Sequence, residues 1–229
     1  MTETAYRIKS FVRRKGRITT GQITDYERLS RQFVLEKNNG SVIEQVNDAS
    51  RRPLNLEIGF GMGDSLAAMS LAHPNENFIG VEVHTPGVAR LVRLIDADKI
   101  DNLRLYEADA IDVLNHCIPE RSLNRVQIYF PDPWHKRKHN KRRLINDDLL
   151  DLLFVKLKPQ GVIHIATDWE DYALQVVGLI NQRRDFRNKS TEQTGYSDKP
   201  IWRPETKFER RGIKLGHNVY DILVQVLKN

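Results

Sequence analysis

The residues best suited to chemistry are glycines and acids at the ends of short apolar runs. Gly59, Gly61 and Gly63 alternate after the first run, and Glu57 lies two residues before the first glycine. Glycines in such a turn permit positive φ and let a ligand approach the bare backbone. Glu82 ends the second run, where a carboxylate can accept hydrogen bonds from the two hydroxyl groups of a ribose. These positions predict a nucleoside site, with a plain strand-to-helix turn and a helix-capping Glu82 as the structural alternatives.

A third acid, Asp109, follows the third run between two alanines and is suited to hydrogen-bond an adenine amino group. The glycines do not fit the Gly-x-Gly-x-x-Gly fingerprint of dinucleotide-binding folds, in which Asp64 would have to be the third glycine. Their spacing disfavours an NAD-dependent dehydrogenase. It resembles instead the first motif of S-adenosylmethionine-dependent methyltransferases.

A proline-rich loop follows the fourth run and carries a further acid, Asp132, between Pro131 and Pro133. A proline disfavours the α region for the residue before it, so Phe130 and Asp132 are both expected to be extended. The Asp132 carboxylate would then be aimed from the carboxyl end of a central strand, although Asp-Pro also initiates turns. Trp134 is suited either to the core or to stacking on a base.

Positive charge is concentrated in two segments, although the formal net charge of the whole chain is only +6. Residues 136–143 contain six Lys or Arg and one His, and residues 1–20 contain six Lys or Arg and one Glu. Basic residues interleaved with aromatic rings favour nucleic acid, because phosphate contacts supply affinity while the rings can stack on bases. A solvated basic face or a localisation signal is the alternative. A metal site at the histidines of this segment is disfavoured, because the neighbouring Lys and Arg side chains would repel a metal ion.

The elements that position these residues alternate along the chain. Six apolar runs are predicted as strands: residues 54–59, 78–83, 103–108, 126–130, 162–167 and 219–227. Five amphipathic stretches are predicted as helices: residues 64–72, 86–98, 110–116, 143–157 and 169–183. This alternation predicts an α/β domain with a mainly parallel sheet. The last run is expected to be antiparallel, because no helix of crossover length precedes it.

The composition predicts one α/β domain over residues 21–229, preceded by a basic, mobile arm over residues 1–20. The single cysteine, Cys117, excludes a disulfide framework and a zinc site built from several cysteines. The apolar runs fall far short of the roughly 20 residues that cross a bilayer. The basic start has no apolar segment of the kind found in secretory signals, so an intracellular protein is expected.

Three motifs in this order carry a resemblance to a known family: Glu57-x-Gly59-x-Gly61-x-Gly63, Gly80-Val81-Glu82 and Phe130-Pro131-Asp132-Pro133-Trp134-His135-Lys136. Residues 139–143 and 203–212 extend it, and residues 11–17 are similar to the family's N-terminal arm. Over essentially the whole chain the sequence resembles the tRNA (guanine-N7-)-methyltransferases. The Pro-Asp-Pro-Trp-His-Lys string is the most specific part of this resemblance.

The resemblance implies a Rossmann-like class I methyltransferase with a seven-stranded, mainly parallel sheet, the last strand antiparallel and helices on both faces. It implies transfer of the S-adenosylmethionine methyl group to N7 of guanosine 46 in the variable loop of tRNA. The cofactor would be S-adenosylmethionine without a metal, and the partner would be tRNA. No membrane and no obligate protein partner are expected, the chain would be a monomer or homodimer, and its location would be cytoplasmic.

The resemblance also implies residue roles. Asp132 would be catalytic, and the cofactor would be bound by Glu57, Gly59, Gly61, Gly63, Glu82, Asp109 and Asp132. The substrate would be contacted by Lys136, Asp168, Thr206, Lys207, Phe208 and Glu209, and the RNA by Lys138, His139, Asn140, Lys141, Arg142 and Arg143. From the residues alone, the pairs Thr167–Glu170 and Thr206–Glu209 each fit a helix capping box. A non-catalytic RNA-binding domain and a methyltransferase acting on a nucleobase amino group remain as alternatives.

Overall fold

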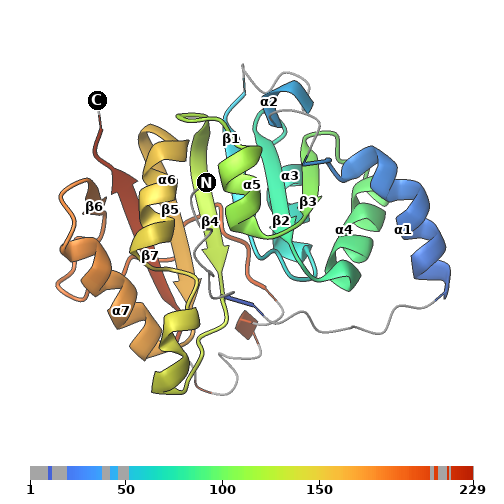
Figure 1. Ribbon diagram of the computed structural model, residues 1–229. Coiled ribbons are helices and arrows are strands. Elements are labelled where there is room, and N and C mark those ends of the chain that lie inside the picture. The colour runs from blue at the N-terminus through green and yellow to red at the C-terminus, as the bar shows by residue number, and fades with distance from the viewer. Residues whose placement is uncertain are drawn as a thin grey trace, which may run out of the picture.

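A single sheet organises the computed structural model, which describes residues 10–11, 20–37, 42–45, 52–206, 209–210, 216 and 218–228. Within these ranges the strands are β1 (Leu54–Ile58), β2 (Asn77–Glu82), β3 (Leu103–Glu107), β4 (Leu123–Tyr129), β5 (Leu157–Thr167), β6 (Phe186–Asn188) and β7 (Tyr220–Val226). They form the order β3-β2-β1-β4-β5-β7-β6 (Figure 1). Adjacent strands from β3 to β5 are parallel, whereas β7 is antiparallel to both β5 and β6. The predicted sheet with an antiparallel last strand is confirmed.

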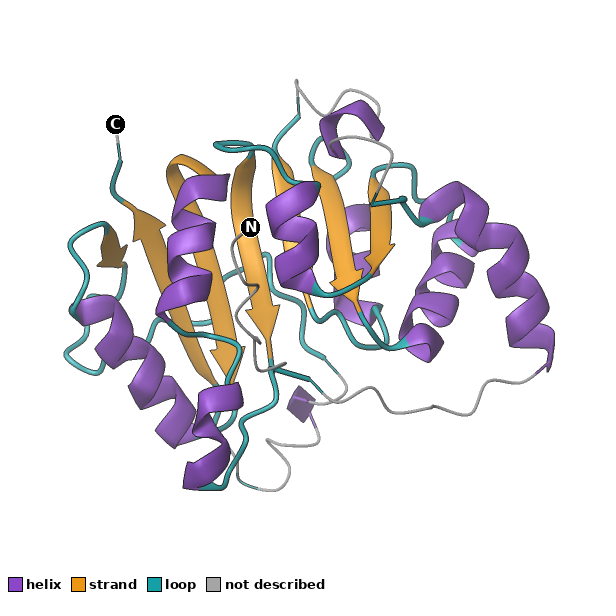
Figure 2. Ribbon diagram, in the orientation of Figure 1, coloured by secondary structure: helices purple, strands orange, loops and turns teal. Residues whose placement is uncertain are grey.

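Helices cover both faces of the sheet (Figure 2). They are α1 (Thr20–Phe33), α2 (Val42–Gln45), α3 (Asp64–Ala72), α4 (Thr85–Ala97), α5 (Ala110–His116), α6 (Asp147–Lys156) and α7 (Glu170–Asn181). One buried apolar cluster joins the sheet to α5, α6 and α7, and a second joins it to α1, α3 and α4. In the described part of the chain, no helix is long and apolar enough to cross a membrane.

Two predicted boundaries are wrong by four or five residues, the largest differences from the prediction. The helix expected from residue 143 begins at Asp147, because the Asn146 side chain accepts the Leu149 N–H and caps it there. The following strand begins at Leu157 instead of residue 162. Residues 158–161 form an irregular excursion inside β5, with Gln160 at a φ of 63° and a shift in register against β4. Pro159 and Gly161 follow the end of α6 at Lys156 and lie within the strand.

Strand β6 and helices α1 and α2 were not predicted from the sequence. Strand β6 has only three residues, two of them polar, so it gave no apolar run. Helix α1 is largely polar, and only Tyr26, Leu29 and Phe33 supply the apolar stripe that packs toward α4. The Tyr26 hydroxyl also donates a hydrogen bond to Glu107 at the end of β3. Most of the predicted basic arm lies outside the described residues.

Candidate active site

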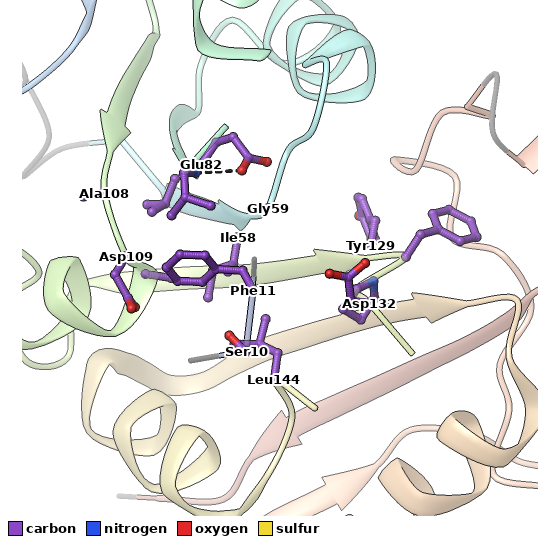
Figure 3. A pocket seen from close by; sticks show the side chains of 15 residues that line it. Ser10, Phe11, Ile58, Gly59, Glu82, Ala108, Asp109, Tyr129, Asp132 and Leu144 are labelled. Carbon is purple, nitrogen blue, oxygen red and sulfur yellow. Dashed lines mark hydrogen bonds between the residues drawn. The ribbon is translucent and has the colours of Figure 1, made fainter. Parts of the chain in front are cut away.

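A pocket of about 210 Å³ lies beyond the carboxyl ends of β1, β2, β3 and β4. The strand order reverses between β1 and β4, and open α/β sheets bind ligands in the crevice at such a point. Figure 3 shows side chains from all four strand ends around this pocket. Four predicted site residues line it: Gly59, Glu82, Asp109 and Asp132. The structure thus brings together acids that are far apart in the sequence.

The glycine turn after β1 depends on backbone conformations that favour glycine. Gly59, Gly61 and Gly63 have φ values of 75°, 58° and 80°. A Cβ atom on Gly63 would come within 2.8 Å of Leu91, whereas one on Gly59 or Gly61 would meet nothing within 4 Å. The first two glycines therefore face open space over bare backbone, which suits the close approach of a ligand.

Glu57 lies in β1, two residues before the first glycine of this turn, and is only 2% exposed. Its Oε1 accepts a hydrogen bond from the Ser65 hydroxyl at 3.2 Å, while the buried Oε2 has no hydrogen-bond partner among the described residues. Burial, with a smaller contribution from the Glu82 carboxylate, raises the pKa of Glu57 to about 8, although the Ser65 hydrogen bond acts in the opposite direction. The unsatisfied oxygen leaves this carboxyl able to accept a further donor or to interact with a cation.

Glu82 and Asp109 also hold local structure. The Oε1 of Glu82 accepts the two backbone N–H groups that follow it, at 2.6 and 3.0 Å, and its Oε2 accepts the N–H of Gly61 at 2.9 Å. Glu82 therefore ties the turn before α4 to the glycine turn, but it does not cap the helix, because all three donors precede Thr85, the first residue of α4. Asp109 caps α5 by accepting the N–H of Ile111 at 2.9 Å.

The proline-rich loop leaves the sheet at a strained residue. Phe130 has a φ of 49°, so the prediction that it is extended is wrong. Its N–H donates to the carbonyl of Ala166 at 2.7 Å, and the chain must turn sharply at this fixed point to leave the sheet. Trp134 also has a positive φ, 48°. Such conformations are uncommon for bulky residues and cluster at functional sites. The exposed Asp132 lies between these two residues and borders the pocket.

The basic loop forms a 3-10 helix, η1 (Arg137–Arg142). The exposed cations of the loop are Arg137, Lys138 and Lys141 in η1 and Lys136 directly before it. The Arg142 guanidinium lies 5.1 Å from the centroid of the Trp134 ring, and His139 makes an edge contact with the same ring. Partial desolvation and the surrounding cations lower the pKa of His139. Trp134 is thus packed within the loop.

Arg143 differs from the exposed cations because it is 2% exposed. Its guanidinium donates to the carbonyl of Pro133 at 2.9 Å, to Gln175 at 2.5 Å and to Asp171 at 2.6 Å. Asn140, in the orientation that satisfies its amide, likewise donates to carbonyl groups of this loop. Both residues were expected to contact RNA, but in the structure Arg143 holds the loop against α7 and Asn140 bonds within the loop. The exposed cations are the better candidates for phosphate contacts.

The predicted substrate residues come from three places. Lys136 lies in the basic loop, and Asp168 follows β5. Thr206 and Glu209 form the predicted capping box, because each backbone N–H donates to the other side chain, at 3.3 and 3.0 Å. The other predicted box is wrong: Thr167 Oγ1 accepts instead from Trp169 N at 3.2 Å. Lys207 and Phe208 lie outside the described residues.

Sequence reasoning missed a buried polar network under β4. The Arg203 guanidinium makes two hydrogen bonds to Asp221, both at 2.8 Å, and two to Glu209, at 2.7 and 2.9 Å. His164 bonds to Asp221 at 2.7 Å and to the Tyr129 hydroxyl at 2.9 Å. The network therefore holds the segment around Glu209 beneath the strand that leads to the proline-rich loop. No sequence spacing reveals it, because its partners come from separate strands and loops.

Two N-terminal residues were also missed. Ser10 and Phe11 line the pocket, and Figure 3 shows the Phe11 ring among its side chains. The carbonyl of Ser10 accepts the indole N–H of Trp134 at 3.1 Å. The only available signal was the resemblance of residues 11–17 to the N-terminal arm of the family, and it gave no contact.

Comparisons with known proteins agree with this geometry. A family model described as "Putative methyltransferase" matches residues 51–222. The tRNA (guanine-N(7)-)-methyltransferase of Alcanivorax borkumensis is 47% identical over 96% of this chain and 91% of the relative. The enzyme of the same name from Marinobacter nauticus is 46% identical over 94% of this chain and 90% of the relative.

Solved structures share the fold at low identity. A 16S rRNA (adenine(1408)-N(1))-methyltransferase from Catenulisporales acidiphilia has a TM-score of 0.57 and 16% identity, with 85% of this chain and 92% of that chain covered. A precorrin-6y C5,15-methyltransferase from Geobacter metallireducens has a TM-score of 0.51 and 15% identity, with 95% and 94% covered. These likenesses show the fold, while the relatives at 46–47% identity show that the chain belongs to the tRNA (guanine-N7)-methyltransferase family.

Proposed function

We propose that this protein transfers the methyl group of S-adenosylmethionine to N7 of guanosine 46 in the variable loop of tRNA. The observation that carries the proposal is the pocket at the strand-order reversal, where Gly59, Glu82, Asp109 and Asp132 meet beside an exposed basic loop. The relatives named for this reaction support it. We also propose that the enzyme is cytoplasmic, needs no obligate protein partner and acts as a monomer or homodimer.

The residues present fit S-adenosylmethionine. The open space over Gly59 and Gly61 suits a ligand that lies against the backbone, and Glu82 and Asp109, which line the pocket, would accept hydrogen bonds from a ribose and an adenine. The buried, unsatisfied Oε2 of Glu57 suits the positive charge of the cofactor. When bound, the cofactor supplies an electrophilic methyl group on a positively charged sulfur.

The chain has little proton chemistry to perform in this reaction. Guanine N7 is an acceptor with a free lone pair, so its attack on a methyl group removes no proton and requires no strong base. The protein must align N7 with the methyl carbon and sulfur, and positioning of this kind contributes several kcal/mol. It must also stabilise the positive charge that develops on the purine, and the exposed carboxylate of Asp132 is placed to do so.

The basic loop supplies the contacts that bring RNA to this pocket. The loop that carries Asp132 also exposes Lys136, Lys138 and Lys141, which can contact phosphates. The deep, narrow major groove of an RNA helix hides N7, so the target guanosine must lie in a loop or leave its stack. A variable-loop guanosine meets this requirement.

Incubation of tRNA with labelled S-adenosylmethionine, followed by nucleoside analysis, tests the proposal. We expect 7-methylguanosine with wild-type enzyme and no label in a tRNA whose guanosine 46 is replaced by adenosine. Label on an amino group of a base would indicate the alternative methyltransferase. S-adenosylmethionine binding by calorimetry without any labelled nucleoside would favour a non-catalytic RNA-binding protein.

A further inference from the structure

A large aromatic side chain stands exposed beside the candidate active site, and the proposed reaction has not used it. Trp169 is 38% exposed, although a tryptophan usually hides most of its surface. It directly follows Asp168 and forms the N-terminal cap position of α7 without a side-chain capping bond. Its backbone N–H is fixed by the hydrogen bond to Thr167 Oγ1.

The strand register places Trp169 at the level of Asp132. Strands β4 and β5 are parallel neighbours, with Tyr129 opposite Ala166 as the last pair. Asp132 and Trp169 each lie three residues beyond that pair, at the same edge of the sheet. Neighbouring strands are about 4.8 Å apart, so the segments that carry Asp132 and Trp169 leave the sheet from adjacent points on this edge.

Contacts between the loop and α7 support this placement. The His135 ring lies 4.2 Å from the Trp169 ring, centroid to centroid, with the planes at 71°. Arg143 bonds to Pro133 on one side and to Asp171 on the other, so it fixes the loop to the first turn of α7. The aromatic pair is therefore held between α7 and the loop that carries Asp132.

We propose that Trp169, supported by His135, is the surface on which the target guanine stacks during methyl transfer. This inference rests on the proposed function and adds a substrate-binding residue to it. The other tryptophan of this region, Trp134, is already packed against Arg142, His139 and Ser10. Trp169 is instead 38% exposed, directly follows Asp168 and contacts the loop that carries Asp132 through His135.

The chemistry of N7 methylation favours an aromatic face at this place. The purine is neutral before the reaction and positively charged after it, and an indole face attracts a cation through its quadrupole. Stacking on Trp169 would therefore strengthen as charge develops in the transition state, which is the kind of interaction that raises kcat. The same face would bind the methylated product more tightly than the unmodified guanine.

Steady-state kinetics of Trp169→Phe and Trp169→Leu test the inference, with Leu174→Ala as the matched control. Leu174 is an exposed apolar residue of α7 as well, so its removal reports on loss of apolar surface alone. We expect Trp169→Leu to lower kcat/KM for tRNA about ten- to a hundredfold, as loss of one base-stacking contact predicts. Trp169→Phe should retain most of the activity, and S-adenosylmethionine affinity and the melting temperature should be unchanged.

A binding comparison separates stacking from a structural role. Wild-type enzyme should bind tRNA carrying 7-methylguanosine several-fold more tightly than unmodified tRNA at mildly acidic pH, and Trp169→Leu should abolish this preference. Activity of Trp169→Leu equal to the Leu174→Ala control would overturn the inference, as would a preference for methylated tRNA that survives in Trp169→Leu. Failure of the wild type to form 7-methylguanosine would instead refute the proposed function.

Discussion

The buried carboxyl group of Glu57 makes the stability of this enzyme depend on pH. Glu57→Gln removes the ionisable group and keeps the shape of the side chain. The pKa of Glu57 is about 8 in the folded protein against an ordinary value of 4.5. Between these values the folded state binds more protons than the unfolded state, so stability falls as pH rises. Below about pH 4.5 and above about pH 8, Glu57 does not change how the free energy of unfolding depends on pH.

The magnitude follows from the two pKa values. Each pH unit between them changes the free energy of unfolding by at most about 1.4 kcal/mol, because one proton is linked to folding. From about pH 5 to pH 8, wild-type protein should lose roughly 3–4 kcal/mol relative to Glu57→Gln. Glu57 is 2% exposed, so solvent screening does not reduce this value as it does for a surface group.

Urea unfolding at a series of pH values measures this difference. Glu120→Gln, which removes an exposed carboxylate, is the matched control. Its free energy of unfolding should depend on pH in the same way as that of the wild type. A positively charged cofactor favours the ionised form of Glu57, so S-adenosylmethionine affinity should rise with pH in the wild type and stay flat in Glu57→Gln. Parallel stability profiles for wild type and Glu57→Gln would refute the reasoning.

Three further predictions follow from the site. Asp132→Ala should lower kcat steeply and weaken S-adenosylmethionine binding only in part; near-wild-type turnover at saturating tRNA would contradict a catalytic Asp132. Lys138→Ala should raise the KM for tRNA and reduce the salt dependence of that KM by about one phosphate contact. Arg143→Ala should instead lower the melting temperature. Identical effects of the two variants would disprove the distinction between an RNA-contacting and a structural cation. Arg203→Met should lower the free energy of unfolding by about 3–5 kcal/mol, since it removes the guanidinium that neutralises two buried carboxylates; chemical denaturation showing less than about 1 kcal/mol would be inconsistent with the network.

The parts predicted from sequence are those whose signal is local. The glycine turn is read from alternating glycines, and the strands are read from apolar runs that are buried on both faces. Strand β6 and helix α1 lack such a signal, because their stability comes from pairing with β7 and packing on α4. Phe130 shows the limit of a local rule, since the hydrogen bond to Ala166 overrides the preference set by the following proline.

The candidate site shows the same division. The four acids could be named because each ends a recognisable run, and three of them line one pocket. The sequence counts Arg143 as one more cation of a basic loop, yet its partners Asp171 and Gln175 lie about thirty residues away. Charge is visible in a sequence, but the partner that neutralises it is not.

The two buried arginines explain how an exposed carboxylate can be held in place. Arg143 fixes the carbonyl of Pro133, directly after Asp132, to helix α7. Arg203 fixes Glu209 and Asp221 beneath Tyr129, three residues before Asp132. Because both sides of the loop are anchored in the interior, Asp132 can face the pocket and stay exposed. A site that must stabilise a developing cation needs this arrangement, since a loosely held carboxylate would lose the alignment on which methyl transfer depends.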